Sequence, residues 1–132
     1  MINQVSVFAP NVKGAMKKIT DVMAAANINI LALVTNDSAE YGIVRMLVDN
    51  PESAQAALKE KGYISQLTPV NGVIISDDCG GLNKLLTDLD YGNINVDYLY
   101  ISYNRGQDNV TAVLHTKDDL DEFLACKGWT VL

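Results

Sequence analysis

The chain has 132 residues, with ten basic side chains, sixteen acidic ones and a formal net charge of −6. An acidic chain without clustered Lys and Arg is a poor match to a phosphate backbone, which argues against nucleic-acid binding. Hydrophobic residues make up 48% of the sequence, yet no apolar run approaches the roughly twenty residues of a membrane span. These features predict an ordered globular protein without a membrane segment, and we expect it in the cytoplasm.

The sequence repeats itself at a constant offset of 66 residues, which is half of its length. Pairs of identical residues at this offset are Val7/Val73, Gly14/Gly80, Leu33/Leu99, Val44/Val110 and Leu58/Leu124, with Asn-Ile-Asn at 27–29 and 93–95. The repeat is too long for a solenoid unit and long enough for a small domain. We therefore predict two domains, residues 1–68 and 69–132, which pack together because each would bury little surface alone.

Apolar periodicity and turn residues predict the order strand, helix, strand, strand, helix, strand in the first half. These elements span residues 2–9, 13–26, 28–36, 41–48, 52–61 and 63–68. Met16, Ile19 and Met23 recur at helical spacing, and Asn50-Pro51 is typical of a helix start. The order βαββαβ predicts an α+β, ferredoxin-like unit with an antiparallel sheet and helices on one face.

The second half repeats this order. Its elements span residues 73–76, 80–91, 95–103, 110–116, 117–127 and 129–132, and turns are predicted at 36–39 and 104–107. We interpret the acidic run of residues 118–122 as the first turn of a helix, where negative charge is favoured, rather than as a metal site. The single histidine, His115, has no second His for a metal site or triad, and Cys79 and Cys126 read as reduced thiols.

The segment Asn11-Val12-Lys13-Gly14 lies where the first strand gives way to the first helix. A glycine there permits a tight turn and exposes the first helical N–H groups, which attract a carboxylate. An Asn side chain beside them offers both a donor and an acceptor. The alternative is structural: Asn11 caps the helix and Gly14 only turns the chain.

With this loop and the Asn-Ile-Asn triplet in both halves, the sequence resembles the ACT domain twice over, and the small free-standing tandem ACT proteins of bacteria. The resemblance implies a non-catalytic regulatory module that binds a free amino acid between ACT domains and needs no cofactor or metal. The ligand-binding positions that it implies are Asn11, Val12, Lys13, Gly14, Asn29, Asp77, Asp78, Cys79, Gly80 and Asn95. The second copy departs from the family pattern because Asp77 stands where the first copy has Asn11.

In a side-by-side pair of such domains, we expect Asn11 and Gly14 to meet Asn95, and Asp77 and Gly80 to meet Asn29. Tyrosines on the sheet face away from the helices need a cover, so we also expect a homodimer. A metabolic enzyme regulated by the protein would be a further partner. The alternative function is an oligomerisation or protein-interaction module whose ligand sites are vestigial.

Overall fold

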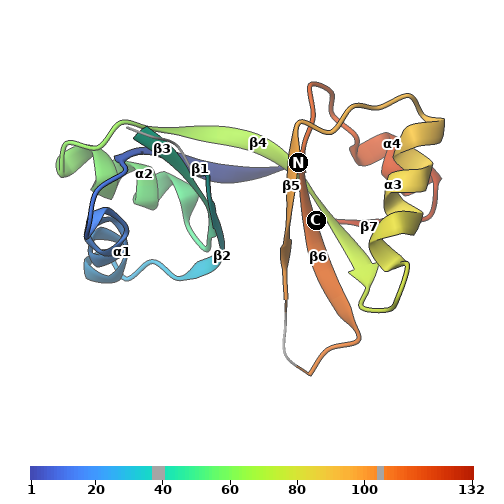
Figure 1. The fold of residues 1–132 in the computed structure, drawn as a ribbon, viewed down its shortest axis with the longest axis horizontal. Helices are drawn as coiled ribbons and strands as arrows, with labels where there is room; N and C mark the ends of the chain where they lie inside the picture. The colour runs from blue at the N-terminus through green and yellow to red at the C-terminus, as the bar shows by residue number, and fades with distance from the viewer. Residues whose placement is uncertain (37–40, 104–105) are drawn as a thin grey trace. The chain divides into compact units, whose positions relative to one another are not determined.

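The computed structural model describes residues 1–36, 41–103 and 106–132. The chain divides into two compact units, one of Asn3–Thr68 and one of Pro69–Leu132 together with Met1–Ile2 (Figure 1). Most of the two predicted turns, at 36–39 and 104–107, lies outside the described residues. Each unit is described by itself below.

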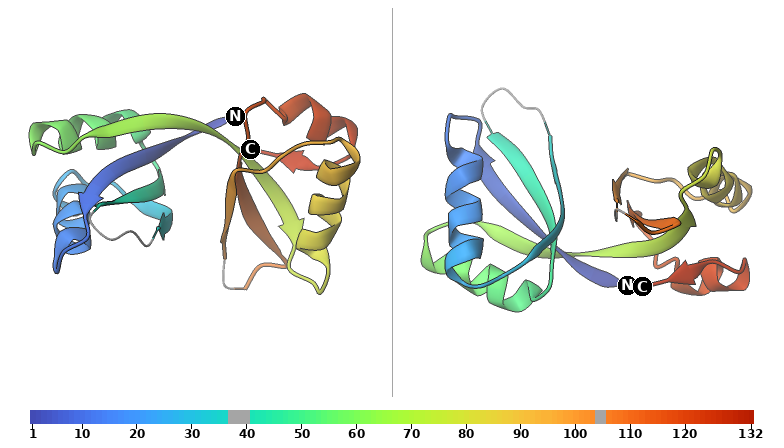
Figure 2. Two further views of the ribbon diagram at one scale, coloured as in Figure 1. Left: turned by 45° about the horizontal axis from the view of Figure 1, so that its top comes forward. Right: turned by 90° about the horizontal axis from the view of Figure 1, so that it is seen from below.

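The first unit has the order βαββαβ. Its elements are β1 (Ile2–Pro10), α1 (Ala15–Ala25), β2 (Ile30–Thr35), β3 (Tyr41–Val48), α2 (Pro51–Glu60) and the beginning of β4 (Ser65–Ser76). The strands lie in the order β2-β3-β1-β4, and β3 pairs antiparallel with both β1 and β2. Both helices pack on one face of this sheet (Figure 2), where Ile19, Met23 and Leu58 are buried against strand residues such as Val7 and Val44.

The second unit repeats the arrangement. Its elements are the end of β4, α3 (Gly81–Tyr91), β5 (Tyr98–Ser102), β6 (Asn109–His115), α4 (Asp121–Cys126) and β7 (Thr130–Val131). The strands lie in the order β7-β4-β6-β5, all antiparallel. Its core contains Val73, Leu85, Leu89, Val110 and Leu124, each one repeat length beyond a core residue of the first unit. The predicted fold, two ferredoxin-like βαββαβ units of the α+β class, is confirmed.

One strand is longer than the sequence suggests. We predict separate strands at 63–68 and 73–76, but β4 is continuous from Ser65 to Ser76. Pro69 lacks an N–H group and would interrupt a ladder that needs its donor. The ladder between β4 and β6 begins only at Asn71, so Pro69 is not required to donate there.

The last helix is shorter than predicted. The sequence suggests a helix over residues 117–127, but α4 covers only Asp121–Cys126. Asp119 Oδ1 accepts a hydrogen bond from the Asp121 amide at 2.9 Å, and Thr116 Oγ1 donates to the Asp118 carbonyl at 2.6 Å. These local bonds hold the preceding residues in a turn, as short polar side chains do when they compete with a helix. The placement of most of the acidic run in the first helical turn was therefore wrong, since only Asp121 and Glu122 lie there.

Candidate functional site

The loop between β1 and α1 is a tight, hydrogen-bonded turn. The Val12 amide donates to the Pro10 carbonyl at 2.9 Å, and the Ala15 amide donates to the Val12 carbonyl at 3.2 Å. Gly14 is the N-cap of α1 with φ of 85°, a conformation that side-chain-bearing residues rarely adopt. Because the N-cap residue is Gly14, Asn11 does not occupy the capping position. The first-turn amides of α1 have no acceptor within the helix, so this end carries positive partial charge.

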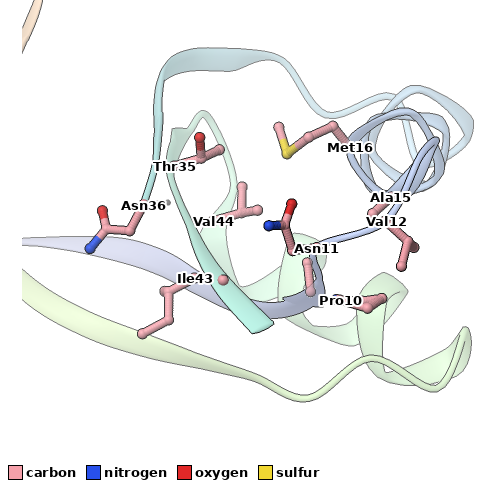
Figure 3. A pocket seen from close by; sticks show the side chains of 11 residues that line it. Pro10, Asn11, Val12, Ala15, Met16, Thr35, Asn36, Ile43 and Val44 are labelled. Atoms are coloured by element: carbon pink, nitrogen blue, oxygen red, sulfur yellow. The ribbon is translucent and has the colours of Figure 1, made fainter. Parts of the chain in front are cut away.

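A pocket of about 110 Å³ lies beside this loop, within the first unit (Figure 3). The described residues that line it come from β1, the loop, α1, β2 and β3: Ala9, Pro10, Asn11, Val12, Ala15, Met16, Thr35, Asn36, Gly42, Ile43 and Val44. Figure 3 shows the side chains of Asn11, Met16, Thr35 and Val44 pointing toward one another, whereas Asn36 points away. The pocket thus combines an apolar wall with amide and hydroxyl groups.

Two of the predicted site residues, Asn11 and Val12, line this pocket, and Gly14 shapes the loop behind it. The sequence reasoning missed Met16, Thr35 and Val44 as lining residues. A signal for Thr35 was available, because Thr35 ends the second strand and in a βαββαβ unit that end lies beside the loop after the first strand. Thr35 is opposite Val44 in the ladder between β2 and β3, which places both on the helix-covered face.

The loop before α3 has the same shape with different chemistry. Gly80 is the N-cap with φ of 87°, and the Gly81 amide donates to the Asp78 carbonyl at 3.0 Å. The Ser76 hydroxyl donates to the Asp78 carboxylate, and the Asp77 amide donates to the Asp108 carbonyl at 3.0 Å. Two carboxylates therefore stand in this loop where the first loop has Asn11 and Val12. The remaining predicted residue of this loop, Cys79, is an exposed free thiol.

The two loops also differ in how closely the helix start approaches the preceding strand. Ala15 lines the pocket of the first unit, and its equivalent in the second unit is Gly81. A Cβ atom on Gly81 would lie 2.2 Å from the Ser76 carbonyl oxygen. The last residue of β4 therefore leaves no room for a side chain at the first position of α3, where the first unit has Ala15. The second loop is the tighter of the two.

The strand-entry asparagines lie away from the loop of their own unit. The Asn29 amide donates to Asp49 Oδ1 at 3.1 Å. Asn29 lies directly before the first residue of β2, whereas Thr35 is the last residue of that strand. Six residues of strand span about 20 Å, so Asn29 does not share the pocket with Asn11. Asn95 donates from Nδ2 to Asp97 Oδ1 at 3.2 Å. The predicted pairing of Asn11 with Asn95 requires a second ACT unit and stays a prediction.

His115 belongs to a polar pair that the sequence did not reveal. Its Nδ1 lies 3.1 Å from Asp97 Oδ2, and its ring stacks on Tyr98 with centroids 4.9 Å apart. The Asp97 amide also donates to the His115 carbonyl at 2.9 Å, so the pair joins the entry of β5 to the end of β6. Among the described residues, no group of three or more His, Cys, Asp or Glu side chains is arranged to hold a metal ion. In the same residues, no helix is both long and apolar enough to span a membrane.

The comparisons with known proteins agree with this geometry. The family model described as an ACT domain pair matches residues 1–122. A crystal structure of a protein from Bacteroides thetaiotaomicron is similar, with a TM-score of 0.90 and 30% identity over 98% of this chain and 90% of that one. The regulatory subunit of aspartate kinase from Thermus thermophilus has a TM-score of 0.64 and 16% identity, over 85% of this chain and 81% of that one. At that identity the likeness concerns the fold alone. No curated protein matches the sequence.

Proposed function

Since the chain belongs to the family of ACT domain pairs, we propose that it is a non-catalytic regulatory protein whose effector is a free amino acid. The effector binds in the pocket beside the loop of residues 11–14. The observation that supports this most directly is the position of the Asn11 side chain, which points into the pocket next to the start of α1 (Figure 3). A metabolic enzyme is the partner whose activity the bound protein would alter.

The two ends of an amino acid need different partners, and the pocket region offers both. In our proposal the carboxylate lies against the first-turn amides of α1, where the helix dipole favours an anion. The ammonium donates to oxygen acceptors, which the side chains of Asn11 and Thr35 carry at the pocket wall. The strand-entry asparagine of a neighbouring ACT unit, Asn29 or Asn95, completes the site. Such a site stabilises a zwitterion and contains no group that must react with it.

Calorimetry and thermal unfolding with each of the twenty amino acids test this proposal. We expect at least one to bind and to raise the unfolding temperature, because a ligand that binds only the folded state stabilises it. Asn11→Ala should weaken binding of that amino acid by about ten-fold or more, the loss of one charge-assisted hydrogen bond. Asn95→Ala should weaken it similarly if a second unit completes the site.

The matched control is Asn83→Ala, which removes an exposed asparagine from the first turn of α3. It should leave binding as in the parent protein. If none of the twenty amino acids binds, the effector proposal is wrong. If an amino acid binds but Asn11→Ala and Asn95→Ala both bind it as the parent does, the site assignment is wrong.

The sheet face that carries the predicted tyrosines does not need a second protomer as its cover, because Tyr100 is only 8% exposed and Val113, opposite it in the ladder, is fully buried. We propose instead a homodimer that pairs the open sheet face of the first unit. Phe8 is 53% exposed and Ile64 is 72% exposed. They are neighbours, because the Phe8 amide donates to the Ile64 carbonyl at 3.0 Å and Phe8 is opposite Ile43 in the ladder with β3. An exposed apolar cluster of this kind commonly marks an interaction surface. Self-pairing of one patch produces a closed twofold dimer.

Sedimentation at micromolar concentration tests the dimer. Ile64→Lys should shift the protein toward the monomer, because a charge in an apolar interface loses its hydration. The control is Thr130→Lys, at the equivalent and exposed position of the second unit, which should leave the oligomeric state unchanged. A parent protein that sediments as a monomer would contradict the proposal.

A further inference from the structure

The pocket beside the 11–14 loop has a composition that selects among amino acids. Its described wall contains apolar side chains, Asn11, Thr35 and Asn36, and none of these described lining residues is acidic or basic. Met16 and Val44 form the inner apolar part, and Val44 is only 3% exposed. A charged ligand side chain placed here would lose its hydration without gaining an opposite charge from the described wall.

The size of the pocket adds a second limit. Its volume of about 110 Å³ is smaller than the roughly 150 Å³ of an apolar cavity that accepts a benzene ring. The pocket is open to solvent on one side, so a phenyl or indole group would have to displace Met16 or Val44 only if it entered the pocket completely. Val44 is fixed in the core of the first unit, so only Met16, which packs at the edge of that core, could move aside. An aliphatic group of three or four heavy atoms fits without such movement.

From the composition and size of this pocket, we infer that the effector is an amino acid with a short, uncharged aliphatic side chain. This inference rests on the proposed function and specifies its ligand class. Valine is the reference ligand, with its isopropyl group against Met16 and Val44. Aspartate and lysine find no oppositely charged partner among the described lining residues, and phenylalanine fits completely only if Met16 moves. Met16 is the residue that determines the upper size limit.

Calorimetry with valine, aspartate, lysine and phenylalanine tests the ligand class. We expect valine to bind at least about ten-fold more tightly than the other three. Burying a charge without a partner, or a group too large for the pocket, weakens affinity by about this factor. Met16→Ala should reduce the difference between valine and phenylalanine by about ten-fold, because it removes the group that a ring would displace. Ala15→Leu should weaken valine binding by filling the pocket.

The control for Ala15→Leu is Ala24→Leu, which adds the same side chain at an exposed position of the same helix and should not affect binding. Tighter binding of a charged or aromatic amino acid, still lost in Asn11→Ala, would overturn the ligand class while leaving the proposed function intact. Absence of binding by all twenty amino acids would overturn the proposed function instead. Unchanged valine affinity in Ala15→Leu would show that the pocket is not where the side chain binds.

Discussion

Replacing Gly81 by alanine should destabilise the second unit, although alanine is normally the better residue in a helix. A Cβ atom at this position would lie 2.2 Å from the Ser76 carbonyl oxygen, and contacts below 3.0 Å are essentially never observed. The two groups would have to separate by about 0.8 Å. Ser76 is held in the ladder opposite Asn109, so this movement would disturb the end of β4.

The cost of such an overpacked contact is about 1–3 kcal/mol. Alanine recovers at most about 1 kcal/mol of this through helix propensity, and less at the first position of the helix. We therefore expect the free energy of unfolding to fall by roughly 1–2 kcal/mol. In a domain of this size, each kcal/mol lowers the unfolding temperature by about 4–8 °C. Thermal and urea unfolding measure the change. The control Asn83→Ala should stay within about 0.5 kcal/mol of the parent. Equal or greater stability of Gly81→Ala would refute the close approach of α3 to β4.

Two further predictions concern single residues of the second unit. Asn93 follows α3 with φ of 55°, so Asn93→Ala should cost about 1–2 kcal/mol while Asn93→Gly should be tolerated, as measured by thermal unfolding. The hydrogen bond from the amino terminus of Met1, together with that from Asn71, lowers the pKa of Asp121 against the opposing effect of burial. Because the pKa of Asp121 is lower in the folded than in the unfolded protein, its carboxylate stabilises the fold at pH values above the unfolded pKa near 3.8. This stabilisation is lost as the pH falls through the lower pKa of the folded protein. The urea concentration at the unfolding midpoint should therefore fall more between pH 6 and pH 3 in the parent protein than in Asp121→Asn. An equal fall in the two proteins would count against the role of Asp121.

The fold was predictable because the signals that specify it are local and occur twice. Helical spacing of Ile19 and Met23, and alternation around Val7, recur one repeat length later with the same burial. The starts of α1 and α3 were likewise marked by glycines, Gly14 and Gly80, which both have positive φ. Packing of a core tolerates few changes in the spacing of apolar residues, so the pattern remains readable.

The pocket was less predictable because its walls meet only through ladder register. The position of Thr35 at the end of the second strand places it beside the loop, but counting alternate residues from Ile30 would turn its side chain to the face away from the helices. An irregularity between Ile30 and Ala32 shifts the register, so that Thr35 lies opposite Val44 on the helix-covered face. A bulge of this kind has no marker in the residues of β2. The short α4 was missed for a related reason, since the Asp119 side chain captures a backbone amide that helical periodicity assigns to the helix.

The difference between the two loops leads to a last prediction, one tight amino-acid site per chain. The first loop places a neutral carboxamide, Asn11, beside the pocket. The second places two carboxylates, Asp77 and Asp78, next to the helix start where an effector carboxylate would lie, and like charges there oppose binding. Calorimetry with the amino acid that binds best should give a stoichiometry of one tight site per chain. That site should be weakened in Asn11→Ala and unchanged in Asp77→Ala. Two tight sites per chain, or loss of the tight site in Asp77→Ala alone, would mean that the second loop binds the effector despite its charge.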